Sequence, residues 1–308
     1  MLVHVPEIRV PFLFLLCMAA MGAEPTDRTL RTFFMGSSLT DSINLRGLQE
    51  LAESRGHVHV WGHHGMAGSP IAFFWPKRDE PGGRPPFGSS GPALRDHEWD
   101  AISLEPRSTY GKELEAALNY IDLAVEKSPG IRIHIFSKWP RTRGGSFDKQ
   151  WLSPEKDIQN NNRYGVECFV EDLRQARPGL AGQIFITPVG HTMHLLDLKC
   201  RAGLVPGMRG IYDGYNDGSH QGPLGKYIVG CTFFATLYRE SPVGLPTEPY
   251  GDIPADIARV IQETAWEAVN AHPRSGVAAP GPLRVITPFF PPATVGEAYS
   301  RELHASFG

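Results

Sequence analysis

The chain has 308 residues, of which 41% are hydrophobic and 20% are charged, a balance typical of a globular protein with a sizeable core. Its formal net charge of −3 gives no electrostatic reason to expect nucleic acid or an anionic membrane surface as a partner. We therefore expect no nucleic acid partner, while the oligomeric state stays open.

The N-terminus has the pattern of an export signal. Arg9 precedes an apolar stretch from Val10 to Met21, and small residues up to Ala23 offer a cleavage site before a polar segment. The stretch is too short to span a bilayer. We expect a signal peptide over residues 1–23, no membrane span, and a secreted or periplasmic mature protein. The alternative is a buried N-terminal helix or anchor.

Strand-like and helical patterns alternate from Thr29 onward. This order predicts an α/β fold, a three-layer α/β/α sandwich with a central parallel sheet of about five strands. The expected strands are 30–35, 58–61, 101–104, 131–136 and 184–187, and the expected helices are 42–54, 112–127, 164–176, 224–238 and 254–271. A Pro/Gly-rich segment over 75–92 breaks the rhythm, and a lid over the carboxyl ends of the strands is one role for it.

Two motifs near opposite ends of this domain carry candidate chemistry. Gly36-Ser37-Ser38-Leu39-Thr40 directly follows the first strand, where a tight turn can expose a serine hydroxyl. Asp217-Gly218-Ser219-His220 precedes the helix over 224–238. An Asp and a His three residues apart can meet on one turn, so we predict a triad of Ser38 as nucleophile, His220 as base and Asp217 as the carboxylate that orients it.

Plainer interpretations of the same residues stay open. Ser38 at this position can simply cap a helix, and Ser37 becomes the nucleophile if the turn is shifted by one residue. The Asp-His segment can be a solvated turn that caps the next helix, and Asp213 is a competing carboxylate.

The two motifs resemble the GDSL or SGNH hydrolase superfamily, whose first block is G-x-S-x-S/T and whose last block is D-x-x-H. The resemblance covers about 29–245 and implies an esterase whose oxyanion is stabilised by the backbone N–H groups of Ser38 and Gly68. The G-x-N-D block of the family is missing. Instead Glu105 follows the third strand, at the place where a variant branch carries Gln, so we expect its side chain near the oxyanion site.

The resemblance further implies a small-molecule or carbohydrate ester as substrate, with short O-acyl (acetyl) groups on carbohydrate favoured. Arg141, after the fourth strand, is a candidate for binding an anionic group or a sugar hydroxyl. Trp61, Trp75 and Trp139 are candidate sugar-stacking surfaces. No metal or organic cofactor is implied.

Two other functions compete with the esterase. Glu105 in place of a donor favours a catalytically weak or inactive SGNH-fold module that binds carbohydrate or adheres to a surface. A zinc-dependent hydrolase that uses the histidines is weaker. His57 and His59 have a spacing that can hold a metal, but no carboxylate or Cys lies at ligand spacing beside them.

We place the hydrolase-like domain at 24–272 and expect a linker and a separate segment after it. A Pro/Gly/Ala-rich linker over 273–285 leads to residues 286–308. That last segment resembles the opening strands of immunoglobulin-like repeats of bacterial surface proteins. About two strands are present, too few to form a sandwich core alone.

Overall fold

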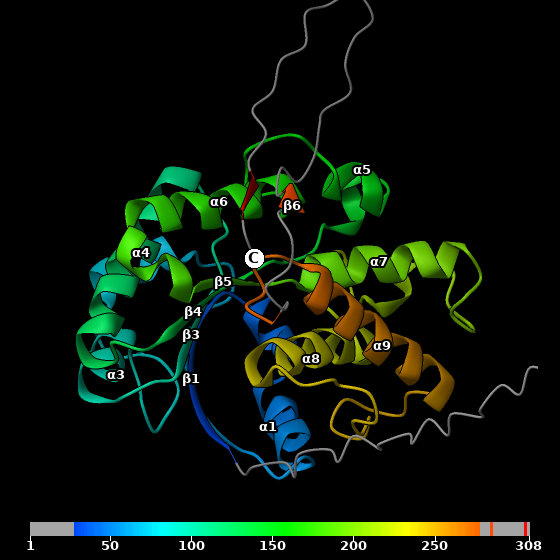
Figure 1. Ribbon diagram of the computed structural model, residues 1–308, viewed down its shortest axis with the longest axis horizontal. Helices are drawn as coiled ribbons and strands as arrows, with labels where there is room; N and C mark the ends of the chain where they lie inside the picture. Colours follow the sequence, from blue (N-terminus) through cyan, green and yellow to red (C-terminus); the bar gives the residue numbers. More distant parts are fainter. Residues whose placement is uncertain (1–27, 278–283, 286–304, 307–308) are drawn as a thin grey trace, which may run out of the picture.

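The structure, a computed structural model, describes residues 28–277, 284–285 and 305–306 (Figure 1). The expected signal peptide over 1–23 lies outside the described residues, and so does most of the immunoglobulin-like segment. Of residues 278–308, the structure describes only the two-residue strands β6 (Arg284–Val285) and β7 (Ala305–Ser306), which pair antiparallel.

The centre of the described domain is a single five-stranded sheet in which every neighbouring pair is parallel. Its strands are β1 (Thr29–Gly36), β2 (Val58–Gly65), β3 (Ala101–Leu104), β4 (Arg132–Phe136) and β5 (Ile184–Thr187). Most of their residues are buried on both faces, as expected for parallel strands covered by helices. The predicted fold class is thereby confirmed.

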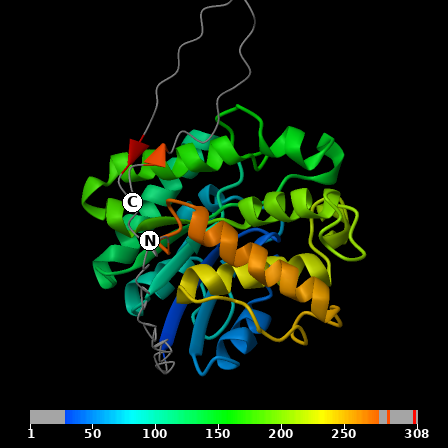
Figure 2. The same cartoon turned by 45° about the vertical axis from the view of Figure 1, so that its right-hand side comes forward.

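Helices cover both faces of the sheet (Figures 1 and 2). One layer holds α1 (Leu45–Glu53), α7 (Val189–Arg201), α8 (Pro223–Tyr238) and α9 (Ala255–Ala271). The other holds α2 (Ile71–Phe74), α3 (Ser90–Asp96), α4 (Tyr110–Lys127) and α6 (Arg163–Ala176). A short α5 (Phe147–Trp151) and five 3-10 turns complete the described elements. Within the described residues, no helix combines the length and apolarity needed to cross a bilayer.

The hydrophobic core divides into two clusters, one on each face of the sheet. Helix α8 is buried nearly all round because it lies between α1, α7 and α9 as well as against the sheet. The amphipathic helices α1 and α6 bury only one side.

The strand order β2-β1-β3-β4-β5 is that of a flavodoxin-like sheet. In this topology the chain leaves β1 toward one side of the sheet and β3 toward the other, so a crevice forms between their carboxyl ends. Ser38 follows β1 and Glu105 follows β3. The topology therefore brings both sequence-predicted residues to the point where such sheets bind ligands.

The middle of the segment over 75–92 contacts the edge strand β2. The backbone N–H of Arg84 donates to the carbonyl of His63 in β2 (2.8 Å), and its guanidinium pairs with Asp41 (2.7 Å). Its last residues begin helix α3 at Ser90. These contacts place the segment beside β2 and beside the residues that follow Ser38, and its role as a lid stays a prediction.

Candidate active site

The serine turn is built so that one of its two hydroxyls is accessible. The N–H of Thr40 donates to the carbonyl of Ser37 (3.0 Å), which closes the turn and starts the 3-10 helix η1 (Thr40–Ile43). Ser37 is 1% exposed, and its hydroxyl is bound inside the protein. Ser38 is partly exposed. The geometry thus favours Ser38 over Ser37 as a nucleophile.

Ser38, His220 and Asp217 form a continuous line of hydrogen bonds. Oγ of Ser38 lies 2.9 Å from Nε2 of His220, and Nδ1 of the same ring lies 2.8 Å from Oδ2 of Asp217. A proton on Nδ1 donated to the carboxylate leaves a lone pair on Nε2 facing the hydroxyl, the tautomer that a general base needs. The structure therefore brings the three predicted side chains together.

Asp217 is locked in place by its own turn. Its Oδ1 accepts hydrogen bonds from the backbone N–H groups of Ser219 (2.7 Å) and His220 (2.8 Å). The bonds from the His220 N–H and ring and from the Ser219 N–H hold the pKa of Asp217 well below its usual range. The competing carboxylate, Asp213, instead pairs with Arg209 at 3.0 Å.

The loop after β4 fixes the position of this Asp-His turn. Trp139 donates its indole N–H to the carbonyl of Ser219 (2.8 Å), and the N–H of Thr142 donates to the carbonyl of Gly218 (3.0 Å). Because these bonds hold the turn by its backbone, the imidazole and carboxylate remain free for the triad.

Glu105 lies next to the serine turn, on its buried side, and does not present its carboxylate at the surface of the site. Its carboxylate is 1% exposed and lies beneath the serine turn. It accepts hydrogen bonds from the N–H groups of Ser37 (2.7 Å) and Thr40 (3.1 Å) and from the hydroxyls of the same two residues (2.8 and 2.7 Å). A turn leaving a strand has unpaired N–H groups, and a buried carboxylate satisfies them. Glu105 therefore supports the turn from below.

Gly36 makes this close approach possible. A Cβ at this position would lie 2.2 Å from Oγ1 of Thr40 and 2.5 Å from Oε2 of Glu105. Any side chain at position 36 would therefore displace the carboxylate or the turn. The glycine of the first motif is explained by packing against Glu105.

Sequence reasoning missed Lys138, the partner of this carboxylate. Its Nζ lies 3.5 Å from Oε1 of Glu105 and donates to the carbonyl of Pro106 (2.5 Å). Burial lowers the pKa of Lys138 to about 8, against the opposing effect of Glu105. A lysine two residues after the end of β4, at the same edge of the sheet as the ends of β1 and β3, was the available signal.

Two backbone N–H groups are available as oxyanion donors. Neither the N–H of Ser38 nor that of Gly68 donates to another residue in the part of the chain that the structure describes. Gly68 follows β2, and the N–H of Met66 donates to the carbonyl of Gly36 (3.3 Å), which brings this segment beside the serine turn. Gly68 has a φ of +76°, a conformation that favours glycine.

The residues considered for substrate binding lie in different environments. Arg141 is exposed and forms no ion pair with a described residue, and its loop is the one that holds the Asp-His turn. Trp139 is 1% exposed, so it has no free face for a sugar ring, contrary to expectation. Trp61 and Trp75 are partly exposed, and the guanidinium of Arg78 covers the ring of Trp75.

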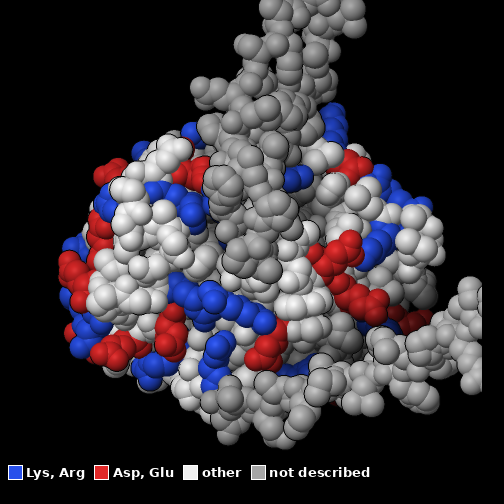
Figure 3. All heavy atoms as spheres, viewed as in Figure 1, with Lys and Arg blue, Asp and Glu red and all other residues white. Residues whose placement is uncertain are grey.

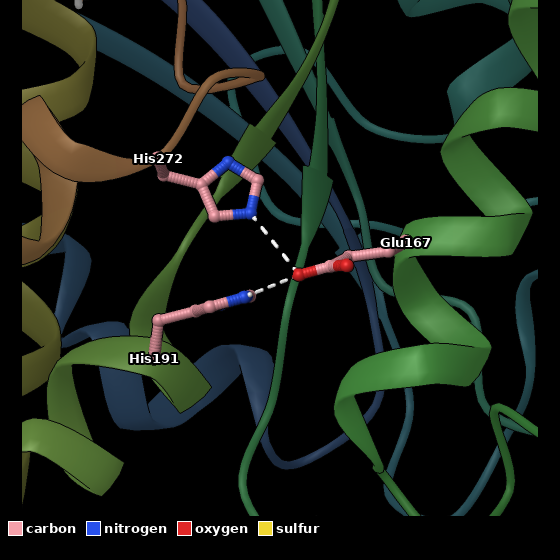
Figure 4. Close-up of side chains that lie close together, drawn as sticks. All are labelled: Glu167, His191 and His272. Carbon is pink, nitrogen blue, oxygen red and sulfur yellow. Dashed lines mark hydrogen bonds and ion pairs between the residues drawn. The ribbon is translucent and has the colours of Figure 1, made fainter. Parts of the chain in front are cut away.

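A second group of side chains, of the types that can bind a metal ion, comes from elements that do not carry the triad. Glu167 of α6, His191 of α7 and His272 at the end of α9 point toward one another (Figure 4). Oε1 of Glu167 lies 2.9 Å from Nε2 of His191 and 3.6 Å from Nε2 of His272. Arg163 approaches the same oxygen at 2.8 Å.

The protons of this group decide between a metal site and a hydrogen-bonded cluster. The N–H of Arg274 donates to Nδ1 of His272 (3.1 Å), so a neutral ring carries its proton on Nε2, the nitrogen that faces Glu167. A metal ligand needs a lone pair there instead. Burial lowers the pKa of His191 to about 3, which favours its neutral form. The arrangement fits a cluster that ties the end of α9 to α6 and α7.

No protein-family model and no curated protein matches this chain. A DUF4886 family protein from Bacteroides uniformis shares its fold, with a TM-score of 0.56 and 19% identity over 79% of this chain and 95% of the other. A protein described as a GDSL-like lipase from Parabacteroides merdae superimposes more weakly, with a TM-score of 0.42 and 11% identity over 69% and 97% of the two chains.

A carbohydrate esterase family 2 enzyme from Corynascus thermopiles gives a TM-score of 0.32 and 9% identity over 59% of this chain and 58% of its own. At such identities the first match shows a common fold and leaves activity to be argued from the site.

Proposed function

We propose that this chain is a serine hydrolase that cleaves carboxylic ester bonds. The observation that carries the proposal is the line of hydrogen bonds from Asp217 through His220 to the partly exposed hydroxyl of Ser38. It lies at the carboxyl edge of the sheet, where the N–H of Ser38 is unpaired, and the unpaired N–H of Gly68, on the segment after β2, is the proposed second donor. This combination of nucleophile, base, orienting carboxylate and oxyanion donors is what acyl transfer requires.

The reaction proceeds in two halves. Oγ of Ser38 attacks the ester carbonyl carbon while Nε2 of His220 takes the hydroxyl proton, and the N–H groups of Ser38 and Gly68 stabilise the oxyanion. The imidazolium, held by Asp217, then gives that proton to the leaving alcohol, which leaves an acyl group on Ser38. Water, deprotonated by His220, releases the acid and restores the hydroxyl.

We further propose a substrate class and a cellular location. A short acyl group, acetyl above all, on a carbohydrate is supported by the resemblance of the two motifs to the SGNH superfamily and by the exposed Arg141 beside the site. Export after removal of residues 1–23 is supported by the N-terminal sequence pattern. Acetate release from acetylated polysaccharide and N-terminal analysis of exported protein test these two points.

The decisive experiment is labelling with a fluorophosphonate probe, mapped to a peptide, together with hydrolysis of p-nitrophenyl acetate. We expect the label on Ser38 and a loss of at least about 10³-fold in kcat for Ser38→Ala. The variant Ser37→Ala should still be labelled at Ser38, which shows which of the two adjacent serines reacts. Activity that survives Ser38→Ala contradicts the proposal. Absence of both labelling and hydrolysis favours instead a module that binds carbohydrate without turnover.

A further inference from the structure

A groove of about 580 Å³ lies at the amino ends of β1, β3 and β4 and beside the end of α8. We call it the arginine groove because Arg28, Arg132 and Arg239 line it together. Figure 3 shows basic side chains gathered near the middle of this face of the molecule. The triad follows the other end of β1, about 25 Å away along an eight-residue strand.

The charges of the arginine groove are not balanced by the protein around it. Arg31 and Lys127 line it as well, and none of its five cations forms an ion pair with a described residue. Its two carboxylates, Glu98 and Asp100, form no ion pair either. The lining thus carries a net charge of +3, from five cations and two anions.

The nearby helix end compensates only part of this charge. Arg132 donates to the carbonyl of Leu237 (2.8 Å) and Arg28 to that of Tyr238 (3.2 Å), both in the last turn of α8. A helix C-terminus is equivalent to about half a negative charge. Burial, and then the repulsion of Arg239 and Arg28, lowers the pKa of Arg132 to about 10. Arg132 thus lies near both Arg239 and Arg28, and the three line one groove.

Arg239 also occupies a strained backbone position. It is the residue that ends α8, and its φ of 59° and ψ of 37° place it in the left-handed region. Helices usually place Gly or Asn there, because other side chains cost about 1 kcal/mol or more. Strained backbone positions of this kind cluster at functional sites.

We propose that the arginine groove binds a tetrahedral oxyanion, a sulfate or phosphate group, between Arg28, Arg132 and Arg239. Guanidinium groups match the oxygens of such anions with paired N–H donors. The groove is larger than one free ion, so it also accommodates the anion as a substituent of a larger molecule. The binding is independent of the proposed ester hydrolysis, because it uses none of the triad residues.

Isothermal titration and thermal unfolding of the full chain test the proposal, with sodium sulfate as the probe and ionic strength matched by sodium chloride. We expect 20 mM sulfate to raise Tm by about 4 °C. Arg239→Asn removes a guanidinium and suits the left-handed backbone, so this variant should unfold at the same or a higher Tm without sulfate. It should nevertheless bind sulfate at least about tenfold more weakly.

Arg259→Gln is the matched control, because Arg259 lies on the surface of α9 and pairs with Glu263 (2.8 Å). It should retain the full response to sulfate. A sulfated polysaccharide is tested in parallel. If it binds much more tightly than free sulfate, the natural ligand carries the anion as a substituent of a larger molecule. If neither probe binds the wild-type chain, or if Arg239→Asn and Arg259→Gln respond alike, the proposal is wrong. Ester hydrolysis should stay unchanged in Arg239→Asn, so failure here leaves the hydrolase proposal intact.

Discussion

The carboxylate of Glu105 and the ammonium group of Lys138 lie 3.5 Å apart beneath the serine turn, and both side chains are almost completely buried. The pair joins the end of β3 to the segment after β4 and faces the turn that follows β1. An ionised carboxylate in this position can accept all four hydrogen bonds that Ser37 and Thr40 donate. We infer that Glu105 is a positioning residue for Ser38.

Replacement of Glu105 by Gln should therefore damage the protein. The amide nitrogen would face N–H and O–H donors, and Lys138 would be left as an unpaired buried cation. We expect the free energy of unfolding to fall by about 3–5 kcal/mol. Turnover should fall as well, because the turn that aims the Ser38 hydroxyl loses its support. Urea denaturation and kcat on p-nitrophenyl acetate measure the two effects.

The double variant Glu105→Gln/Lys138→Met provides the control. It removes the unpaired cation, so stability should return in part while kcat stays low. Wild-type stability and activity in Glu105→Gln alone would show that the carboxylate is not needed beneath the turn.

Asp217→Asn should lower activity without a matching loss of stability. The amide cannot hold the imidazole in the tautomer that leaves Nε2 free for Ser38, and the expected fall in kcat is about 10²–10⁴-fold. Asp217 is half exposed, so Tm should change little. Asp213→Asn is the matched change in the competing carboxylate, and its kcat should stay within about twofold of wild type. Equal losses in the two variants would argue against the assigned triad.

Gly68→Ala tests the second oxyanion donor. No atom lies within 4 Å of the added Cβ, so the substitution acts through the backbone, whose φ of +76° disfavours a side chain by about 1–2 kcal/mol. Gly207 has a φ of +70° and equally open surroundings, and Gly207→Ala should therefore cost the same stability. Only Gly68→Ala should reduce kcat, by about tenfold or more, as its N–H turns away from the oxyanion. Similar kcat values in both variants would remove Gly68 from the site.

The sheet and the meeting of the triad residues were accessible from sequence because both depend on chain order. Alternating strand and helix patterns predict a parallel sheet, and a serine directly after its first strand must then lie at the carboxyl edge. Asp217 and His220 meet within one turn, so their contact needs no long-range information.

Other features depend on tertiary contacts that a single sequence does not reveal. The position of Glu105 at a strand end was evident, but its direction is set by donors 65 and 68 residues earlier in the chain. Trp139 was expected to be open to ligand and is buried, because its indole N–H holds the Asp-His turn. Strand β2 was expected to end at Trp61 and continues to Gly65, since pairing with β1 overrides the weak strand preference of His63 and His64.

Buried histidines should make the protein sensitive to acid. His59 is 4% exposed, neither ring nitrogen has a partner among the described residues, and burial lowers its pKa to about 3. A histidine in the unfolded chain has a pKa of about 6.5. As pH falls below that value, the unfolded chain binds a proton that the folded protein does not bind until about pH 3. Stability present above pH 6.5 is therefore lost progressively between these two values.

The variant His59→Leu lacks the imidazole that the unfolded chain protonates. The free energy of unfolding should fall with decreasing pH in both proteins. Between pH 6 and pH 4 its slope should be smaller in the variant than in the wild type by about 1.4 kcal/mol per pH unit. Above pH 7.5 the two proteins should differ by a constant amount, which isolates the packing effect of the substitution from the effect of the proton. Urea denaturation over a pH series gives both quantities. Parallel curves across the whole acidic range would mean that His59 takes up its proton in the folded state as readily as in the unfolded chain.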